Sequence, residues 1–177
     1  MQARYHAISG GVAASLLIPV LGVNSIFFFA SSILIDGDHY LDYVYRNGFK
    51  DFSVRRMFAF HEHLFKKASV RNLLALNIMH TVEFLLLMHA ASVITDWVWL
   101  KAALWGILFH MAFDLIYLYI KGRFIHRSFS VVDYLVRWNR RKRQGLNPEL
   151  PYQSALKAIS VRPVVSEDEG VEAEREH

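Results

Sequence analysis

The stretch SSILIDGDHYLDY, residues 31–43, brings four ionisable side chains to the end of one of the most apolar runs in the chain. They are Asp36, Asp38, His39 and Asp42. Carboxylate and imidazole groups are costly to bury at the edge of an apolar segment unless they pair, reach water or bind an ion. This corner is therefore where an apolar segment ends and where a candidate metal site begins.

The composition separates apolar and charged residues along a chain of 177 residues, which is the length of one domain. The chain is 54% hydrophobic, yet residues 72–94 and 97–120 are nearly uncharged, and each is long enough to cross a hydrocarbon core of about 30 Å. A third apolar region, residues 7–35, is interrupted by Pro19 and Gly22, which favours either a short hairpin or one bent helix. We predict an all-α integral membrane bundle of about four helices, with a short N-terminal hairpin and two full-length spans.

The charged residues predict the topology and the domain organisation. Lys and Arg are concentrated in residues 46–71 and 137–143, so we expect both segments, and both termini, on the cytoplasmic side of a multi-pass membrane protein. The expected parts are a membrane-embedded metal-site domain (1–121), a basic interfacial segment (122–145) and a disordered cytoplasmic tail (146–177). Because the basic residues flank apolar spans, the net charge of +4 points to membrane lipids as partners rather than to nucleic acid.

The chain has no cysteine, so any metal must be held by nitrogen and oxygen ligands. Ligands of this kind suit Zn, Mn, Fe or Mg, and we expect Zn, with Mn or Fe as alternatives. On the two predicted spans, His80, His110 and Asp114 fall at comparable depths of roughly 10–16 Å from the basic side. His6 and the corner at Asp36 lie at the same face of the membrane in this topology. The spacing therefore predicts a shared metal site.

Spacing within each predicted span supports such a site. His110 and Asp114 are four residues apart and share a helix face, and His80 and Glu83 are three residues apart. His89 lies about half a turn round the helix from His80 and is left out of the site. The pair His61 and His63, in the sequence HEH, is equally typical of an exposed polar turn, and its role stays open.

These motifs together resemble a family. RYHAISGG at residues 4–11, IDGDH at 35–39, MHTVEF at 79–84 and GILFHMAFD at 106–114 are similar to segments of bacterial inner-membrane metal-dependent hydrolases, a family named for a LexA-regulated member. That family is distantly related to zinc-dependent phospholipase C and to fungal single-strand nucleases. The resemblance covers residues 1–120 and implies a helical, inner-membrane protein with two or more zinc-like ions. The ligands it implies are His6, Asp36, Asp38, His39, His80, His110 and Asp114.

The resemblance further implies hydrolysis of a phosphoester or similar bond, and a site that opens at the membrane interface favours a lipid or another amphiphile as the substrate. Two metal ions activate a bound water and stabilise the oxygens of an in-line displacement. In the predicted centre the metal ligands are His6, Asp38, His39, His80, His110 and Asp114, and Asp36 and Glu83 are the carboxylates expected to act in catalysis. Two alternatives remain. One is a non-enzymatic metal-binding membrane protein. The other is a di-iron membrane oxidase, and the absence of paired His-x-x-His-His clusters from the sequence argues against it.

Overall fold

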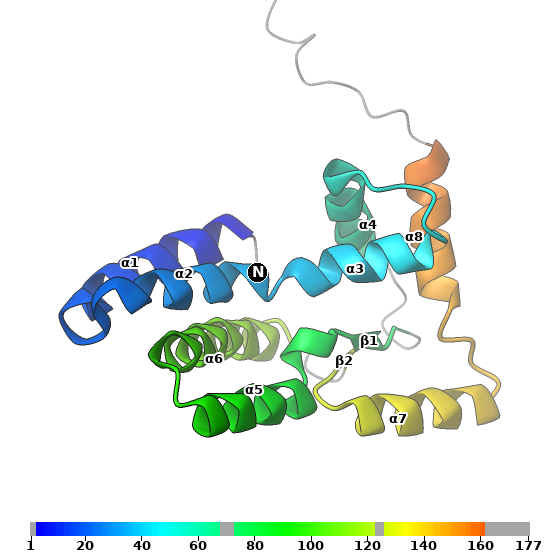
Figure 1. The fold of residues 1–177 in the computed structure, drawn as a ribbon. Helices are drawn as coiled ribbons and strands as arrows, with labels where there is room; N and C mark the ends of the chain where they lie inside the picture. The colour runs from blue at the N-terminus through cyan, green and yellow to red at the C-terminus, as the bar shows by residue number, and fades with distance from the viewer. Residues whose placement is uncertain (1–2, 68–72, 123–125, 162–177) are drawn as a thin grey trace, which may run out of the picture.

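The computed structural model describes residues 3–67, 73–122 and 126–161, and Figure 1 shows that these are mostly helical. The predicted all-α class is confirmed, with one short parallel pairing between β1 and β2. The elements are α1 (Ala3–Leu21), η1 (Gly22–Asn24), α2 (Ser25–Leu34), α3 (Gly37–Arg46), α4 (Val54–Lys67), β1 (Ala75–Leu76), η2 (Ile78–His80), α5 (Val82–Thr95), α6 (Val98–Ile120), β2 (Arg127–Ser128), α7 (Val131–Arg143) and α8 (Leu150–Val161).

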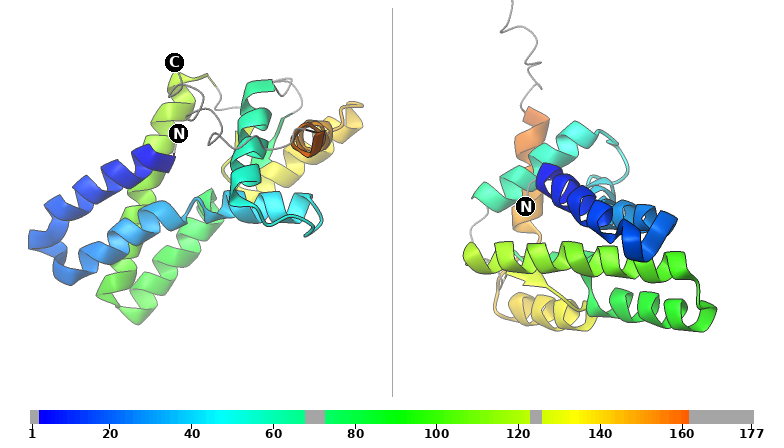
Figure 2. Two further views of the ribbon diagram at one scale, coloured as in Figure 1. Left: turned by 90° about the horizontal axis from the view of Figure 1, so that it is seen from above. Right: turned by 90° about the vertical axis from the view of Figure 1, so that its left-hand side faces the viewer.

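Helices α1 and α2 form an antiparallel hairpin, which Figure 2 shows from two further sides. The chain reverses at η1, where Gly22 has a φ of 56°, a left-handed value that glycine adopts without steric cost. Pro19 lies inside α1, one turn before that reversal. Of the two arrangements open to residues 7–35, the hairpin is the one that forms.

The hairpin packs on α6 through a backbone contact that requires glycine. A Cβ atom added at Gly106 would lie 2.1 Å from the carbonyl oxygen of Phe28 and 2.3 Å from Oγ of Ser31. The same Ser31 hydroxyl donates a hydrogen bond of 2.8 Å to the carbonyl oxygen of Ala103 on α6. The absence of a side chain at Gly106 therefore sets the distance between α2 and α6, and with it the position of the α2–α3 corner.

The prediction of a full-length helical span over residues 72–94 is wrong for the described part of that range. Helix α5 has 14 residues and begins only at Val82, after β1 and η2. The backbone is extended at Asn77 and Thr81, and the Thr81 hydroxyl accepts a hydrogen bond from the backbone N–H of Phe84, which caps the helix. The apolar composition does not predict this break. Residues 75–76 are extended because they pair with β2, which lies more than 50 residues further along the chain.

Helix α6 matches its prediction in both length and position, since it runs for 23 residues from Val98. A tight turn joins α5 to α6. Asp96 adopts a left-handed φ of 55° there and ends α5. Helix α6 therefore carries His110 and Asp114 on one continuous helix, as their spacing required.

Helices α3, α4 and α8 form a second packed unit beside the hairpin (Figure 1). Helix α8 corrects the prediction that residues 146–177 are a disordered tail, although residues 162–177 lie outside the described part. Tyr152 and Ala155 are buried on α8, and the Tyr152 hydroxyl donates a hydrogen bond of 2.7 Å to the carbonyl oxygen of Leu74. The buried cluster of this unit consists of Tyr43, Val44, Met57, Phe60, Leu64, Leu73, Tyr152 and Ala155.

Helix α7 is the basic helix expected within residues 122–145. Its last turn contains Arg140, Arg141, Lys142 and Arg143. Val132, Leu135 and Val136 are exposed and, at this spacing, share one face of the helix. The helix is therefore amphipathic.

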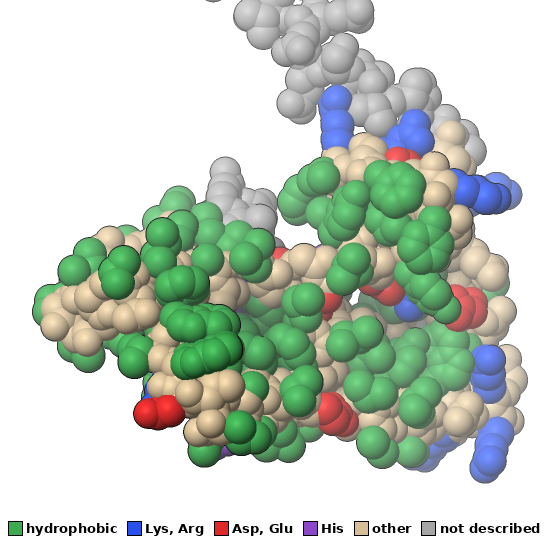
Figure 3. All heavy atoms as spheres, viewed as in Figure 1, with side chains coloured by type: hydrophobic (Ala, Val, Ile, Leu, Met, Phe, Trp, Pro, Cys, Tyr) green, Lys and Arg blue, Asp and Glu red, His purple; other side chains and the backbone are tan. Residues whose placement is uncertain are grey.

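Two helical stretches, Tyr5–Arg46 and Val98–Ile120, are long and apolar enough to cross a membrane. The first stretch covers both helices of the hairpin, which the turn at η1 separates, and continues through α3. In the most apolar window of each stretch, 11% of the residues of the first and 39% of those of the second are buried, so most of these residues are partly or fully exposed. Figure 3 shows hydrophobic side chains covering one side of the hairpin, of α6 and of α4. The number of membrane crossings stays a prediction.

Candidate metal centre

Four side chains from three parts of the fold form a cluster that could hold a metal ion. Each of Asp36, His80, His110 and Asp114 offers one ligand atom, and these atoms all lie within 4.8 Å of one another. Asp36 lies at the α2–α3 corner, His80 ends η2, and the other two residues lie one turn apart on α6. We call these four residues the ligand cluster. It brings together residues that are up to 78 positions apart, and all four were predicted to belong to the site.

His80 is oriented by a carboxylate outside the ligand cluster. Its Nδ1 atom lies 2.9 Å from Oδ2 of Asp38, which also accepts the backbone N–H of Met79 at 3.2 Å. Because a carboxylate only accepts, the His80 proton lies on Nδ1, and Nε2 is left with a lone pair facing the cluster. Burial lowers the pKa of His80, which favours this neutral form, the one that binds metals.

Asp38, which was predicted as a direct ligand, lies outside the four residues of the ligand cluster. Its side chain is 5% exposed and lies behind His80, where Oδ1 also accepts a hydrogen bond of 3.3 Å from the side-chain amide of Asn77. Carboxylates in this position orient a histidine ligand and raise its basicity. Asp36, which was expected to act in catalysis, is the carboxylate of this corner that belongs to the ligand cluster.

His110 is oriented by the backbone of α2. Its Nδ1 donates a hydrogen bond of 2.7 Å to the carbonyl oxygen of Ser32. In the neutral ring Nε2 then carries the lone pair, and this atom lies 3.4 Å from Nε2 of His80 and 3.4 Å from Oδ1 of Asp36. The packing of α2 on α6 thus controls the orientation of this imidazole.

Asp114 uses its two oxygens for different neighbours. Oδ1 lies 3.2 Å from Nε2 of His6, and Oδ2 accepts a hydrogen bond of 2.9 Å from Nη1 of Arg127. The His6 ring also stacks on His110, with 3.9 Å between the ring centroids. His6 was predicted as a ligand and is buried against the cluster, close enough to supply a further nitrogen.

Arg127, which begins β2, is the residue that sequence reasoning missed. Arg127 is buried, and its guanidinium reaches Asp114 on α6 from β2. The available signal was Asp114 itself, since an ionised carboxylate within an apolar helix calls for a cation nearby. The spacing could not identify which cation, because the contact depends on the β1–β2 pairing.

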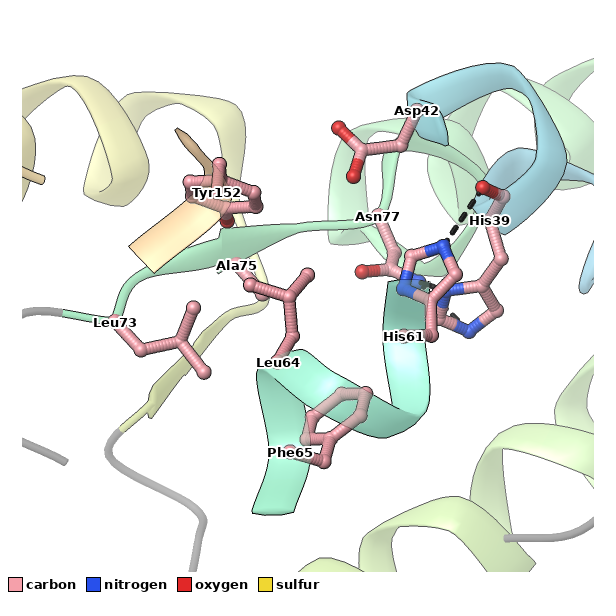
Figure 4. Close-up of a pocket in the computed structure, with 9 residues that line it drawn as sticks. All are labelled: His39, Asp42, His61, Leu64, Phe65, Leu73, Ala75, Asn77 and Tyr152. Atoms are coloured by element: carbon pink, nitrogen blue, oxygen red, sulfur yellow. Dashed lines mark hydrogen bonds between the residues drawn. The ribbon is translucent and has the colours of Figure 1, made fainter. Parts of the chain in front are cut away.

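His39 lies on the outer side of Asp36, 3.5 Å from Oδ1, and was predicted as a ligand. The amide nitrogen of Asn77 lies 3.0 Å from its ring. Nε2 of His61 donates a hydrogen bond of 2.9 Å to the His39 carbonyl oxygen, and Figure 4 shows both imidazoles lining one pocket. His61 therefore supports the corner from outside the ligand cluster, and His63 lies half-buried elsewhere on α4.

Glu83, which was predicted as a second catalytic carboxylate, lies outside the ligand cluster. Its Oε1 accepts hydrogen bonds from the Ser130 hydroxyl at 2.6 Å and from the Val131 N–H at 3.0 Å, so it ties α5 to the start of α7. It is not one helix turn from His80, because His80 lies before α5 begins. His89, which was left out of the site, is exposed on α5.

The ligand cluster combines two imidazoles with two carboxylates, a ligand set that suits Zn, Mn or Fe. The Asp36 side chain is 28% exposed, whereas those of His80, His110 and Asp114 are at most 10% exposed, so the cluster is reached from the Asp36 side. Comparisons with protein-family models, with curated proteins and with solved structures give no match to this chain.

Proposed function

We propose that this protein is a membrane-bound, metal-dependent hydrolase of a phosphoester bond in a lipid or another amphiphile. The observation that carries the proposal is the ligand cluster, in which two imidazoles, each held by a bond at Nδ1, direct Nε2 toward Asp36 and Asp114. Metal ligands in proteins are characteristically held in this way by a second layer of hydrogen bonds. The resemblance of residues 1–120 to inner-membrane metal-dependent hydrolases supports the same reaction class.

The apolar surface supports a place in the inner membrane. Leu16, Val20 and Ile94 are each at least 75% exposed, which is costly in water and favourable in lipid. The cationic end of α7 suits the cytoplasmic side, where anionic lipids attract Lys and Arg. We place both termini on that side and the amphipathic α7 along the interface. The ligand cluster would then open near the level of the lipid headgroups.

In the proposed reaction, the residues of the chain hold and orient the reacting groups. A bound divalent ion would supply Lewis-acid activation of water at the ligand cluster. His80 and His110 would hold it through Nε2, while Asp38 and the Ser32 carbonyl keep both rings in place. Asp36 is the most accessible member, so it lies where substrate and water enter. His6 and His39 are the nearest further imidazoles, and we assign them to a second ion.

Metal analysis of detergent-purified protein tests the proposal. The wild type should contain a stoichiometric divalent metal, and His110→Ala and Asp36→Ala should each lose most of it. His89→Ala is the matched control, because it removes an imidazole from the exposed surface of α5 and should retain the metal. Unchanged metal content in both cluster variants would show that the site is wrong.

A hydrolysis assay on phosphodiesters and phospholipids completes the test. We expect turnover by metal-loaded wild type and its loss in both cluster variants. Full metal loading without turnover on any substrate would favour a non-enzymatic metal-binding protein. Iron as the bound metal, with the spectrum of a coupled di-iron pair, would favour an oxidase.

A further inference from the structure

Arg127 has hydrogen-bonding capacity that the ligand cluster does not use. Its residue is 9% exposed, and one nitrogen, Nη1, donates to Asp114. The other two side-chain nitrogens, Nε and Nη2, are buried and have no hydrogen-bond partner among the residues that the structure describes. A guanidinium stays charged at all physiological pH values, so these donors cannot be neutralised by losing a proton.

Neutralising Asp114 does not by itself explain this arrangement. A single hydrogen bond of 2.9 Å from Nη1 already pairs the two charges, and Nε2 of His6 lies 3.2 Å from the other oxygen of Asp114. Unpaired buried donors cost free energy, more so on a charged group. The planar guanidinium has the geometry to bind two oxygens of one phosphate or carboxylate at once.

Arg127 is also fixed in place beside the ligand cluster. Its residue pairs with Ala75 across the β1–β2 bridge, and its carbonyl oxygen accepts a hydrogen bond of 3.2 Å from Arg137. The Asp114 oxygen that it binds lies 3.8 Å from Nε2 of both His80 and His110. Oδ2 of Asp114 therefore lies between the guanidinium and the two imidazoles. The β1–β2 pairing and Arg137 hold Arg127 in this position.

We propose that Arg127 binds an anionic phosphoryl oxygen of the substrate next to the metal. This inference rests on the proposed function and adds to it a residue that binds the substrate. Phosphodiesters and phosphomonoesters both carry the negatively charged tetrahedral group that such a residue would bind. Neutral carboxylic esters and amides fit this guanidinium less well, because they bring neither a negative charge nor two equivalent oxygens to its donors.

Titration of the zinc-loaded full-length protein with inorganic phosphate tests the inference by calorimetry, with metal content measured on the same samples. Arg127→Gln should bind phosphate at least about tenfold more weakly than the wild type does. Arg127→Lys keeps the charge opposite Asp114 but lacks the planar pair of donors, so it should retain metal and still lose most of the phosphate affinity. Lys121→Gln is the control, because it removes one exposed positive charge at the end of α6 and should bind phosphate normally.

The outcomes separate this inference from the proposed function. A wild type without metal overturns both. Metal-loaded Arg127→Lys with wild-type phosphate affinity overturns the inference alone, and this variant decides the matter if Arg127→Gln does not fold. A second titration compares glycerol phosphate with phosphatidic acid in mixed micelles. Tighter Arg127-dependent binding in the micelles supports a lipid headgroup, and equal binding supports a soluble phosphoester.

Discussion

Asp38 and His80 are 42 residues apart in the chain, and their side chains meet over 2.9 Å between Oδ2 and Nδ1. This bond decides which imidazole nitrogen faces the ligand cluster. We expect Asp38→Asn to weaken metal binding by roughly 10- to 100-fold, because the amide orients the imidazole less firmly and lowers its basicity. A titration against a competing chelator measures the change.

Asp42→Asn is the matched control for Asp38→Asn. Asp42 lies on the same helix but pairs with Arg46 at 2.7 Å, away from the cluster. Its variant should bind metal as the wild type does. Equal affinities for Asp38→Asn and the wild type would mean that Asp38 does not orient His80 for a metal.

Gly106→Ala should separate α2 from α6. The new methyl group would lie 2.1 Å from the Phe28 carbonyl oxygen, and a backbone atom cannot move aside as a side-chain end can. We expect a loss of stability of about 1–3 kcal/mol or more. Metal affinity should fall as well, because the Ser32 carbonyl that orients His110 moves with α2. Thermal unfolding and metal titration in detergent measure the two effects.

A glycine on α1 provides the comparison for Gly106→Ala. A Cβ atom at Gly11 would make only an ordinary contact of 3.5 Å with the Phe29 ring. Gly11→Ala should be neutral or slightly stabilising, since alanine favours helix more than glycine does. If the two variants behave alike, the close approach at Gly106 does not limit the packing.

Tyr152→Ala tests the packing of α8. Tyr152 is 2% exposed, hydrogen-bonds the Leu74 carbonyl oxygen and lies under the guanidinium of Arg46, 3.3 Å from the ring centroid. We expect its removal to cost about 3–5 kcal/mol of unfolding free energy, as for other large buried aromatic residues. Tyr45→Ala, at a position 71% exposed, should change it by less than about 0.5 kcal/mol. Chemical denaturation compares the two, and equal losses would mean that α8 does not pack as described.

His61 should make the stability of the metal-free protein depend on pH. Burial lowers the pKa of His61 from its ordinary value of 6.5. Because the unfolded chain binds the proton more readily, the folded state gains stability that is complete above pH 6.5 and is lost as the pH falls toward the lowered pKa. The melting temperature should therefore fall on acidification, and His61→Gln should flatten that fall. His89→Gln, at an exposed position, should leave the slope unchanged, and an equally steep slope in His61→Gln would contradict the assignment.

Some features of the site followed from sequence alone because they are local. His110 and Asp114 share a face of α6 because a helix places residues four apart on one side. The polar corner at residues 36–39 was visible as an abrupt end to an apolar run. The absence of cysteine limited the ligands to nitrogen and oxygen. These conclusions needed only composition and helical periodicity.

Only the tertiary structure decided which of the corner carboxylates enters the cluster and how His80 reaches it. Asp36 and Asp38 are two residues apart, so in a helical segment they point in directions about 200° apart, and the orientation of α3 selects one. His80 arrives from η2 because β1 pairs with β2, and Arg127 arrives by the same pairing. Helical periodicity describes one element at a time, whereas these contacts join elements distant in the chain. The sequence therefore determined which side chains were available at this corner, and the packing of α2, α6 and the β1–β2 pair determined their roles.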